Sequence, residues 1–186
     1  MLTEDYIMRM INQAMAAFLQ ALGLKKAGKY SEAQQSFNQS IEVLLGLQAD
    51  LVDQLDDSQV LTMLTFLDRL DTDRLLLLAD IYHEQGEVLA LLQHRPESQF
   101  AAQRSLRFYL EVALATDSVP PLELIQKIET QRQKISPTEL GLETRLAMLD
   151  YYERLLEAGA AVPVEAGLPR QELQALISSL DTPDLH

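Results

Sequence analysis

The chain has 186 residues, a formal net charge of −13 at pH 7 and no cysteine. A chain of this length buries enough apolar surface to fold without a structural metal, and without cysteine it can form neither disulfides nor thiolate metal sites. With 47% hydrophobic and 23% charged residues it is not an intrinsically disordered protein, and its excess of acids disfavours nucleic acid as a partner because phosphate groups would be repelled.

The first helix is predicted from residue 3 to residue 26, where apolar residues recur every three to four positions. Thr3 is its expected N-cap, and Lys25 and Lys26 in its last turn complement the helix dipole. Gly28 follows as a left-handed terminating residue. Ser31-Glu32-Ala33-Gln34 has the form of a capping box and predicts a second helix that ends at residue 45. The short connection predicts an antiparallel hairpin.

The middle of the chain predicts one short helix over residues 58–67, followed by a long helix over 74–94 that Thr72 or Asp73 caps. Gly86 lies inside the long helix, so both a continuous helix and a break at this glycine remain open. Pro96 suits the first turn of the next helix, which extends to residue 116.

The last third predicts three more helices. Pro120 and Pro121 open the first of them, and Ser136-Pro137-Thr138-Glu139 forms a second capping box that begins a helix ending at Gly159. Residues 160–168 form a loop, a last helix extends from Pro169 to residue 180, and residues 181–186 form a frayed tail.

The fold class is therefore all-α, because no segment shows the period-two alternation of strands. We expect seven to eight helices in a single domain over residues 1–180, with hairpins at about 4–45, 73–116 and 137–180.

The first hairpin carries a spacing pattern beyond helicity. Gly28, Tyr30, Ala33, Phe37 and Ser40 stand at offsets of 0, 2, 5, 9 and 12, which resembles the turn and second helix of a tetratricopeptide repeat. The small residues allow close helix approach, and the aromatic rings fill the space beside them. The resemblance implies antiparallel hairpins stacked as an irregular right-handed α-solenoid with additional helices.

The N-terminal quarter resembles a bacterial family of uncharacterised helical proteins. The residues that carry this likeness are Glu4-Asp5-Tyr6-Ile7, Arg9, Ile11, Leu22-Gly23-Leu24-Lys25-Lys26 and Gly28-x-Tyr30. The resemblance implies helical-repeat architecture and bacterial origin, and it brings no activity.

In tetratricopeptide domains, side chains of first helices line a concave groove. The resemblance therefore places Met15, Phe18, Leu22, Lys25 and Lys26 in a candidate partner-binding groove. Two alternatives stay open: the two lysines serve only as dipole partners, and the methionines of this helix fill the core.

No motif for catalysis, a cofactor or a metal is found. His83-Glu84 lacks a second histidine four residues on, and His83 and His94 would lie about 16 Å apart on a helix, too far to share a metal. Asp71, Thr72 and Asp73 are expected to cap a helix. The aspartates that lie in or beside predicted turns are Asp53, Asp56, Asp57, Asp68, Asp71 and Asp73.

These observations favour a non-catalytic module that binds a protein or peptide partner or self-associates, with a homodimer as one form. The alternative is a small-molecule sensor or an enzyme with a pocket between helices. We expect a cytoplasmic location, since no apolar run reaches the roughly 18–20 residues of a membrane-spanning helix and the chain opens with acids. A third hypothesis, lipid-surface binding by the first helix, is disfavoured by its few cations.

Overall fold

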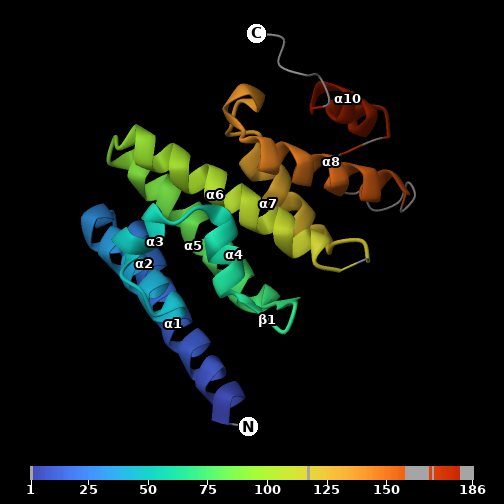
Figure 1. Cartoon of the computed structure of the whole chain (residues 1–186). Coiled ribbons are helices and arrows are strands. Elements are labelled where there is room, and N and C mark those ends of the chain that lie inside the picture. The colour runs from blue at the N-terminus through green and yellow to red at the C-terminus, as the bar shows by residue number, and fades with distance from the viewer. Residues whose placement is uncertain (1, 117, 158–167, 169, 181–186) are drawn as a thin grey trace. The chain divides into compact units, whose positions relative to one another are not determined.

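The computed structural model describes all residues except 1, 117, 158–167, 169 and 181–186. Its described part contains nine α-helices, one 3-10 helix and one pair of two-residue strands, so the all-α prediction is confirmed. Contacts divide the chain into unit 1, residues 1–105, and unit 2, residues 106–186 (Figure 1). Each unit is described by itself, and the single domain and the solenoid arrangement remain predictions.

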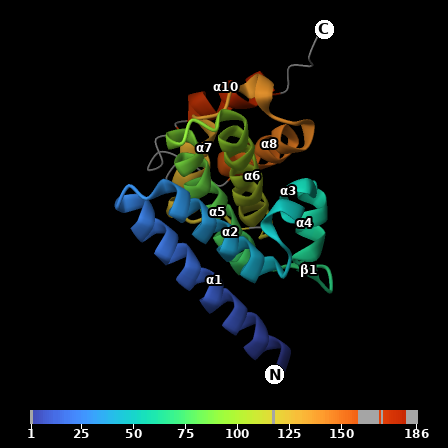
Figure 2. The same ribbon diagram turned by 90° about the vertical axis from the view of Figure 1, so that its left-hand side faces the viewer.

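Helices α1 (Leu2–Lys26) and α2 (Tyr30–Leu45) form the predicted antiparallel hairpin and lie side by side in both views (Figures 1 and 2). Gly28 has φ +73°, the left-handed conformation that the turn requires. Two serines of α2 bond to backbone carbonyls of α1: Ser40 Oγ donates to Ala14 O at 2.7 Å and Ser36 Oγ to Ala17 O at 2.9 Å. These bonds satisfy buried hydroxyls and hold the two helices close together.

The residues that carry the repeat-like spacing lie in the turn and in α2 of this hairpin. Ala33, Phe37 and Ser40 are fully buried, Tyr30 is half-buried next to the turn, and the Phe37 ring contacts the Phe18 ring with centroids 6.0 Å apart. One detail is wrong: Ser31 does not cap α2. The helix begins at Tyr30 with Lys29 as N-cap, two residues before Ser31, and no side chain caps it.

The segment between the hairpins differs from its prediction. It contains α3 (Ala49–Gln54), α4 (Asp57–Met63), and strands β1 (Thr65–Phe66) and β2 (Arg69–Leu70), so the expected helix over 58–67 is wrong. The strands pair antiparallel around Leu67 and Asp68, whose φ angles are +49° and +58°. A two-residue turn with both φ angles positive usually contains glycine or asparagine. Because Leu67 occupies the first position here, no signal in the sequence indicated this turn.

Helices α5 (Thr72–Leu91) and α6 (Arg95–Leu114) form the second hairpin. Asp71 caps α5 by accepting a hydrogen bond from Arg74 N at 3.1 Å. The helix continues through Gly86, which settles the alternative left open by the sequence. A Cβ at this glycine would lie 3.3 Å from Ser98 O and 3.4 Å from Ala101 Cβ, so glycine permits the close approach of α6.

Unit 2 contains α7 (Leu122–Arg132), the 3-10 helix η1 (Pro137–Glu139), α8 (Leu142–Glu157) and α10 (Arg170–Leu180). The capping box of Ser136 and Glu139 is present, but it opens η1 rather than α8, because the chain leaves the helical conformation at Leu140. The predicted loop at 160–168 falls almost entirely outside the described residues, as do the helix start at Pro169 and the tail.

The described helices were also compared with the dimensions of a bilayer. None of them combines the length and the apolar character that crossing a membrane requires.

Candidate functional site

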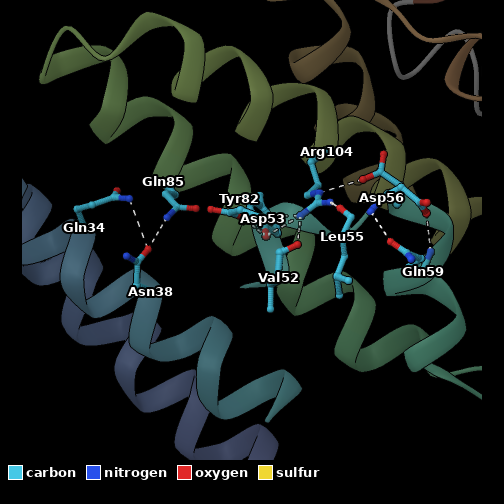
Figure 3. Close-up of polar contacts among 11 residues, drawn as sticks. Gln34, Asn38, Val52, Asp53, Leu55, Asp56, Gln59, Tyr82, Gln85 and Arg104 are labelled. Atoms are coloured by element: carbon cyan, nitrogen blue, oxygen red, sulfur yellow. Dashed lines mark hydrogen bonds and ion pairs between the residues drawn. The ribbon is translucent and has the colours of Figure 1, made fainter. Parts of the chain in front are cut away.

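The most highly connected polar side chain of unit 1 is Arg104 on α6, which is only 2% exposed. Its Nε donates to Asp57 Oδ1 at 2.9 Å, its Nη1 to Val52 O at 3.0 Å, and its Nη2 to Leu55 O (Figure 3). Arg104 thereby fastens the short α3–α4 segment to the second hairpin. A guanidinium suits this position because its fixed fork of donors reaches a carboxylate and two carbonyls at once.

Tyr82 on α5 joins this network through its hydroxyl group. Arg104 Nη1 donates to Tyr82 Oη at 3.2 Å, and Tyr82 Oη donates to Asp53 Oδ1 at 2.9 Å. Burial raises the pKa of Tyr82 well above its ordinary value, and the charge of Arg104 only partly opposes this shift. The phenol therefore stays protonated and acts as a fixed donor, which is a structural role.

Arg104 also contacts two aromatic rings. Its Cζ lies 5.4 Å from the centre of the Tyr82 ring and 4.7 Å from that of Phe100. Burial lowers the pKa of Arg104, but Tyr82 and Asp57 outweigh this effect and raise it overall, so the guanidinium remains charged. The network is thus a permanently charged, fully hydrogen-bonded support for the residues around it.

A pocket of about 550 Å³ opens beside this support, between α2, α3, α5 and α6 of unit 1. Its ionisable lining groups are three carboxylates, one histidine and the Tyr82 phenol, with no lysine or arginine among them. The lining residues are Gln34, Asn38, Asp50, Asp53, Tyr82, Gln85, Leu89, His94, Pro96, Glu97, Phe100 and Ala101.

Three amides form one wall of the pocket (Figure 3). Asn38 Oδ1 accepts hydrogen bonds from Gln85 Nε2 at 2.8 Å and from Gln34 Nε2 at 3.5 Å. This arrangement fixes the orientation of the Gln34 amide, whose Oε1 is buried and finds no donor among the described residues. Because that oxygen is enclosed, a ligand could bond to it only after the Gln34 side chain moved.

The candidate groove residues of α1 lie apart from this pocket. Phe18 is 8% exposed and packs against Phe37 within the first hairpin, Leu22 is half-buried, and Met15 is exposed. The structure does not bring them together with the residues that line the pocket.

The two lysines of the candidate groove differ from each other. Lys25 Nζ lies 2.6 Å from Glu84 Oε2 and 2.5 Å from Glu87 Oε2, so it links the end of α1 to α5, whereas Lys26 is exposed. Burial lowers the pKa of Lys25, but its hydrogen bonds and charge interactions with both glutamates raise it overall. Lys25 is therefore part of a tertiary ion pair rather than only a dipole partner.

A possible metal-ligand set lies at the same place. One ligand atom each from His83, Glu84 and Glu87 falls within 4.8 Å of the others, although the sequence showed no metal motif. The Lys25 ammonium already contacts both carboxylates, and a metal ion would have to displace it. The cluster thus forms a contact between α1 and α5 in which one ammonium is shared by two carboxylates.

The sequence search missed the residues that build the pocket. Arg104 stands three residues after Ala101 and four before Phe108, both buried, and Gln85 stands three after the buried Tyr82. A polar residue on an apolar helix face is the signal that could have identified them. Of the residues expected to cap a helix, Asp71 does so for α5. Asp56 caps α4, whereas Asp53 and Asp57 bind the Tyr82–Arg104 pair.

Unit 2 has its own buried polar cluster and a smaller pocket. Glu129 accepts hydrogen bonds from Tyr152 Oη at 3.0 Å and from Arg132 Nε at 2.7 Å. A pocket of about 420 Å³ lies between the end of α7, η1, α8 and α10. Its described lining includes Met148, Leu176 and two cations, Arg132 and Lys134.

Comparison with known proteins gives no relative for this chain. No family model matches it, and no curated protein or solved structure shows detectable similarity to it. Its function must therefore be argued from its own residues.

Proposed function

We propose that this protein is a non-catalytic recognition module that binds a basic segment of a protein partner in the pocket of unit 1. The observation that carries the proposal is the chemistry of the pocket wall, which contains the carboxylates of Asp50, Asp53 and Glu97 and no lysine or arginine. A lysine or arginine side chain brings both the positive charge and the donors that this wall accepts.

Pre-organisation of the wall supports the same proposal. Arg104 and Tyr82 hold Asp53, and Gln85 holds Asn38, so two sides of the pocket are fixed before any ligand arrives. Phe100 is partly exposed at the rim, where its ring can cover the aliphatic part of a long basic side chain. A fixed site loses less entropy on binding than a mobile one.

The proposal is tested by NMR titration of the whole chain with two capped tripeptides, Gly-Arg-Gly and Gly-norleucine-Gly. We expect only the arginine peptide to shift the side-chain amide signals of Gln34, Asn38 and Gln85. Asp50→Asn combined with Glu97→Gln removes two exposed charges from the rim and should weaken binding about tenfold, which corresponds to about 1.4 kcal/mol.

A matched control removes two acids elsewhere in unit 1. Asp68→Asn with Asp73→Asn makes the same change in net charge on exposed residues that do not line the pocket. If both double variants weaken peptide binding equally, the binding is nonspecific charge attraction. If the peptide shifts none of the amide signals, the proposal is rejected.

A small-molecule sensor remains a second candidate because the pocket volume falls within the roughly 300–1,000 Å³ typical of small-ligand sites. Free arginine or a free polyamine would then bind at least as tightly as a longer basic peptide. A protein partner instead predicts that affinity increases as residues flanking the arginine are added.

A further inference from the structure

Helix α1 carries no charged residue from Met10 to Leu24, although charged residues make up 23% of the whole chain. Much of this stretch is exposed. The first turns of helix α1 extend beyond the end of α2 (Figure 2). An exposed helix surface without charge over four turns is unusual for a protein surface and marks an interaction site.

The exposed apolar residues of α1 form one continuous face. Met8, Met15 and Leu19 are 54%, 37% and 58% exposed, and Ile11 and Leu22 between them are half-buried. Their spacing of three and four residues places these five side chains in one row, which we call the α1 stripe. A different face of the same helix, with Ala14, Ala17, Phe18 and Ala21, is buried in the α1–α2 hairpin.

We infer that the α1 stripe is the interface with a second copy of this chain, in which the two α1 helices pack antiparallel about a two-fold axis at Met15. In such a pair, residues whose numbers sum to 30 lie opposite each other. Met15 then faces the partner's Met15, Ile11 faces the partner's Leu19, and Met8 faces the partner's Leu22. Every member of the stripe meets another member, which is the self-complementarity that a two-fold interface requires.

The charges at the two ends of α1 select this partner and this direction. Asp5 lies at the start of the helix and Lys26 at its end, and both are exposed. The antiparallel arrangement places Lys26 of one copy within one residue of the level of the partner's Asp5, and it does so twice by symmetry. A parallel arrangement would instead bring like charges together, which disfavours it.

The inference does not depend on the pocket of unit 1, because no residue of the stripe lines it. Failure of the peptide titration would leave the dimer unaffected. A monomeric chain would likewise leave the pocket proposal unaffected.

Cysteine cross-linking tests the geometry directly, because the chain has no native cysteine. Met15→Cys should form a disulfide-linked dimer under mild oxidation, since residues at the two-fold axis approach within disulfide range. Met8→Cys and Leu22→Cys should each stay unlinked alone but link to each other when the two proteins are mixed. Gln13→Cys, which is exposed on α1 outside the stripe, is the matched control and should stay unlinked.

Charge exchange tests the direction of packing by analytical ultracentrifugation. Lys26→Glu or Asp5→Lys alone should raise the dimer dissociation constant about three- to tenfold, as expected for two exposed ion pairs, and the double variant should restore it. Circular dichroism verifies that each variant stays folded. A chain that sediments as a monomer at high micromolar concentration, or equal self-linking by Met8→Cys and Met15→Cys, would overturn the inference.

Discussion

Arg104 illustrates how a single residue organises a segment that has little core of its own. The α3–α4 segment comprises helices of six and seven residues, and such short helices are marginal without tertiary support. Arg104 supplies that support through the carbonyls of Val52 and Leu55 and through Asp57. The pocket wall at Asp53 also contacts this arginine, so the fold of this segment and the proposed binding site depend on the same residue.

The neighbouring lysines of α1 are expected to differ in their effect on stability. Lys25→Met removes an ammonium shared by Glu84 and Glu87 and leaves two carboxylates facing each other, so we expect a loss of about 1 kcal/mol. Lys26→Met changes an exposed residue and should alter stability by less than about 0.5 kcal/mol. Urea unfolding in dilute solution measures both; equal losses would show that Lys25 acts only on the helix dipole.

Asp53 is expected to make stability depend on pH. Burial raises the pKa of Asp53 above its ordinary value of 3.8, and the hydrogen bond from Tyr82 and the charge of Arg104 oppose this only in part. The folded state thus holds the proton more tightly than the unfolded state. The stabilisation by this proton is complete below pH 3.8 and is lost as pH rises through the folded pKa.

The variant Asp53→Asn cannot ionise but still accepts the hydrogen bond from Tyr82. Its stability relative to the wild-type chain should therefore increase as pH rises from below 3.8 towards neutrality. Urea unfolding of both proteins over this range measures the difference, with Asp68→Asn, an exposed residue that does not act on Asp53, as the control for net charge. A difference that is constant or decreases with pH would contradict the assignment.

At the scale of elements, the two hairpins of unit 1 share a mode of contact. In the first, Ser36 and Ser40 of α2 donate to carbonyls of α1. In the second, Ser98 and Ser105 of α6 donate to Gly86 O at 2.8 Å and Ala79 O at 2.9 Å on α5. Serine is small enough to permit close approach of the two helices. Its hydroxyl hydrogen-bonds to a carbonyl of the neighbouring helix, so serine can occupy a buried position where alanine would otherwise pack.

The close approach at Gly86 gives a prediction with an internal control. Gly23→Ala on exposed α1 has no atom within 4 Å of the new Cβ and should stabilise the protein by about 0.5–1 kcal/mol through helix propensity. Gly86→Ala gains the same propensity but presses its Cβ against Ser98 O, a backbone atom that its own serine hydroxyl fastens to Gly86 O. We expect a net loss of about 1 kcal/mol.

Thermal and urea unfolding measure both alanine variants. Stabilisation by Gly86→Ala would mean that α6 can move away from α5 without cost, and it would remove the packing explanation for this glycine.

Over the whole molecule, periodicity predicted the long helices and their hairpins because each buries a wide apolar face. It failed over residues 49–70, where stability comes from long-range bonds to Arg104 and the turn at Leu67–Asp68 has no typical turn residue. A pocket between helices was one alternative from the sequence, but most of its lining residues were not predicted, for a related reason. Its residues come from four helices, and their proximity depends on tertiary packing that a single sequence does not display.

The exposed tip of the β1–β2 hairpin is a point at which the chain can be cut or extended. Phe66 and Leu67 are 76% and 79% exposed, and they form a peptide link that a chymotrypsin-like protease prefers and can reach. A cut there would break the chain between α4 and α5, but the two fragments would stay associated. Arg104 would still hydrogen-bond to Val52 and Leu55, and Lys25 would still pair with Glu84. The same tip is thus the natural opening for new chain ends or an inserted reporter, at a point where the fold holds both halves in place.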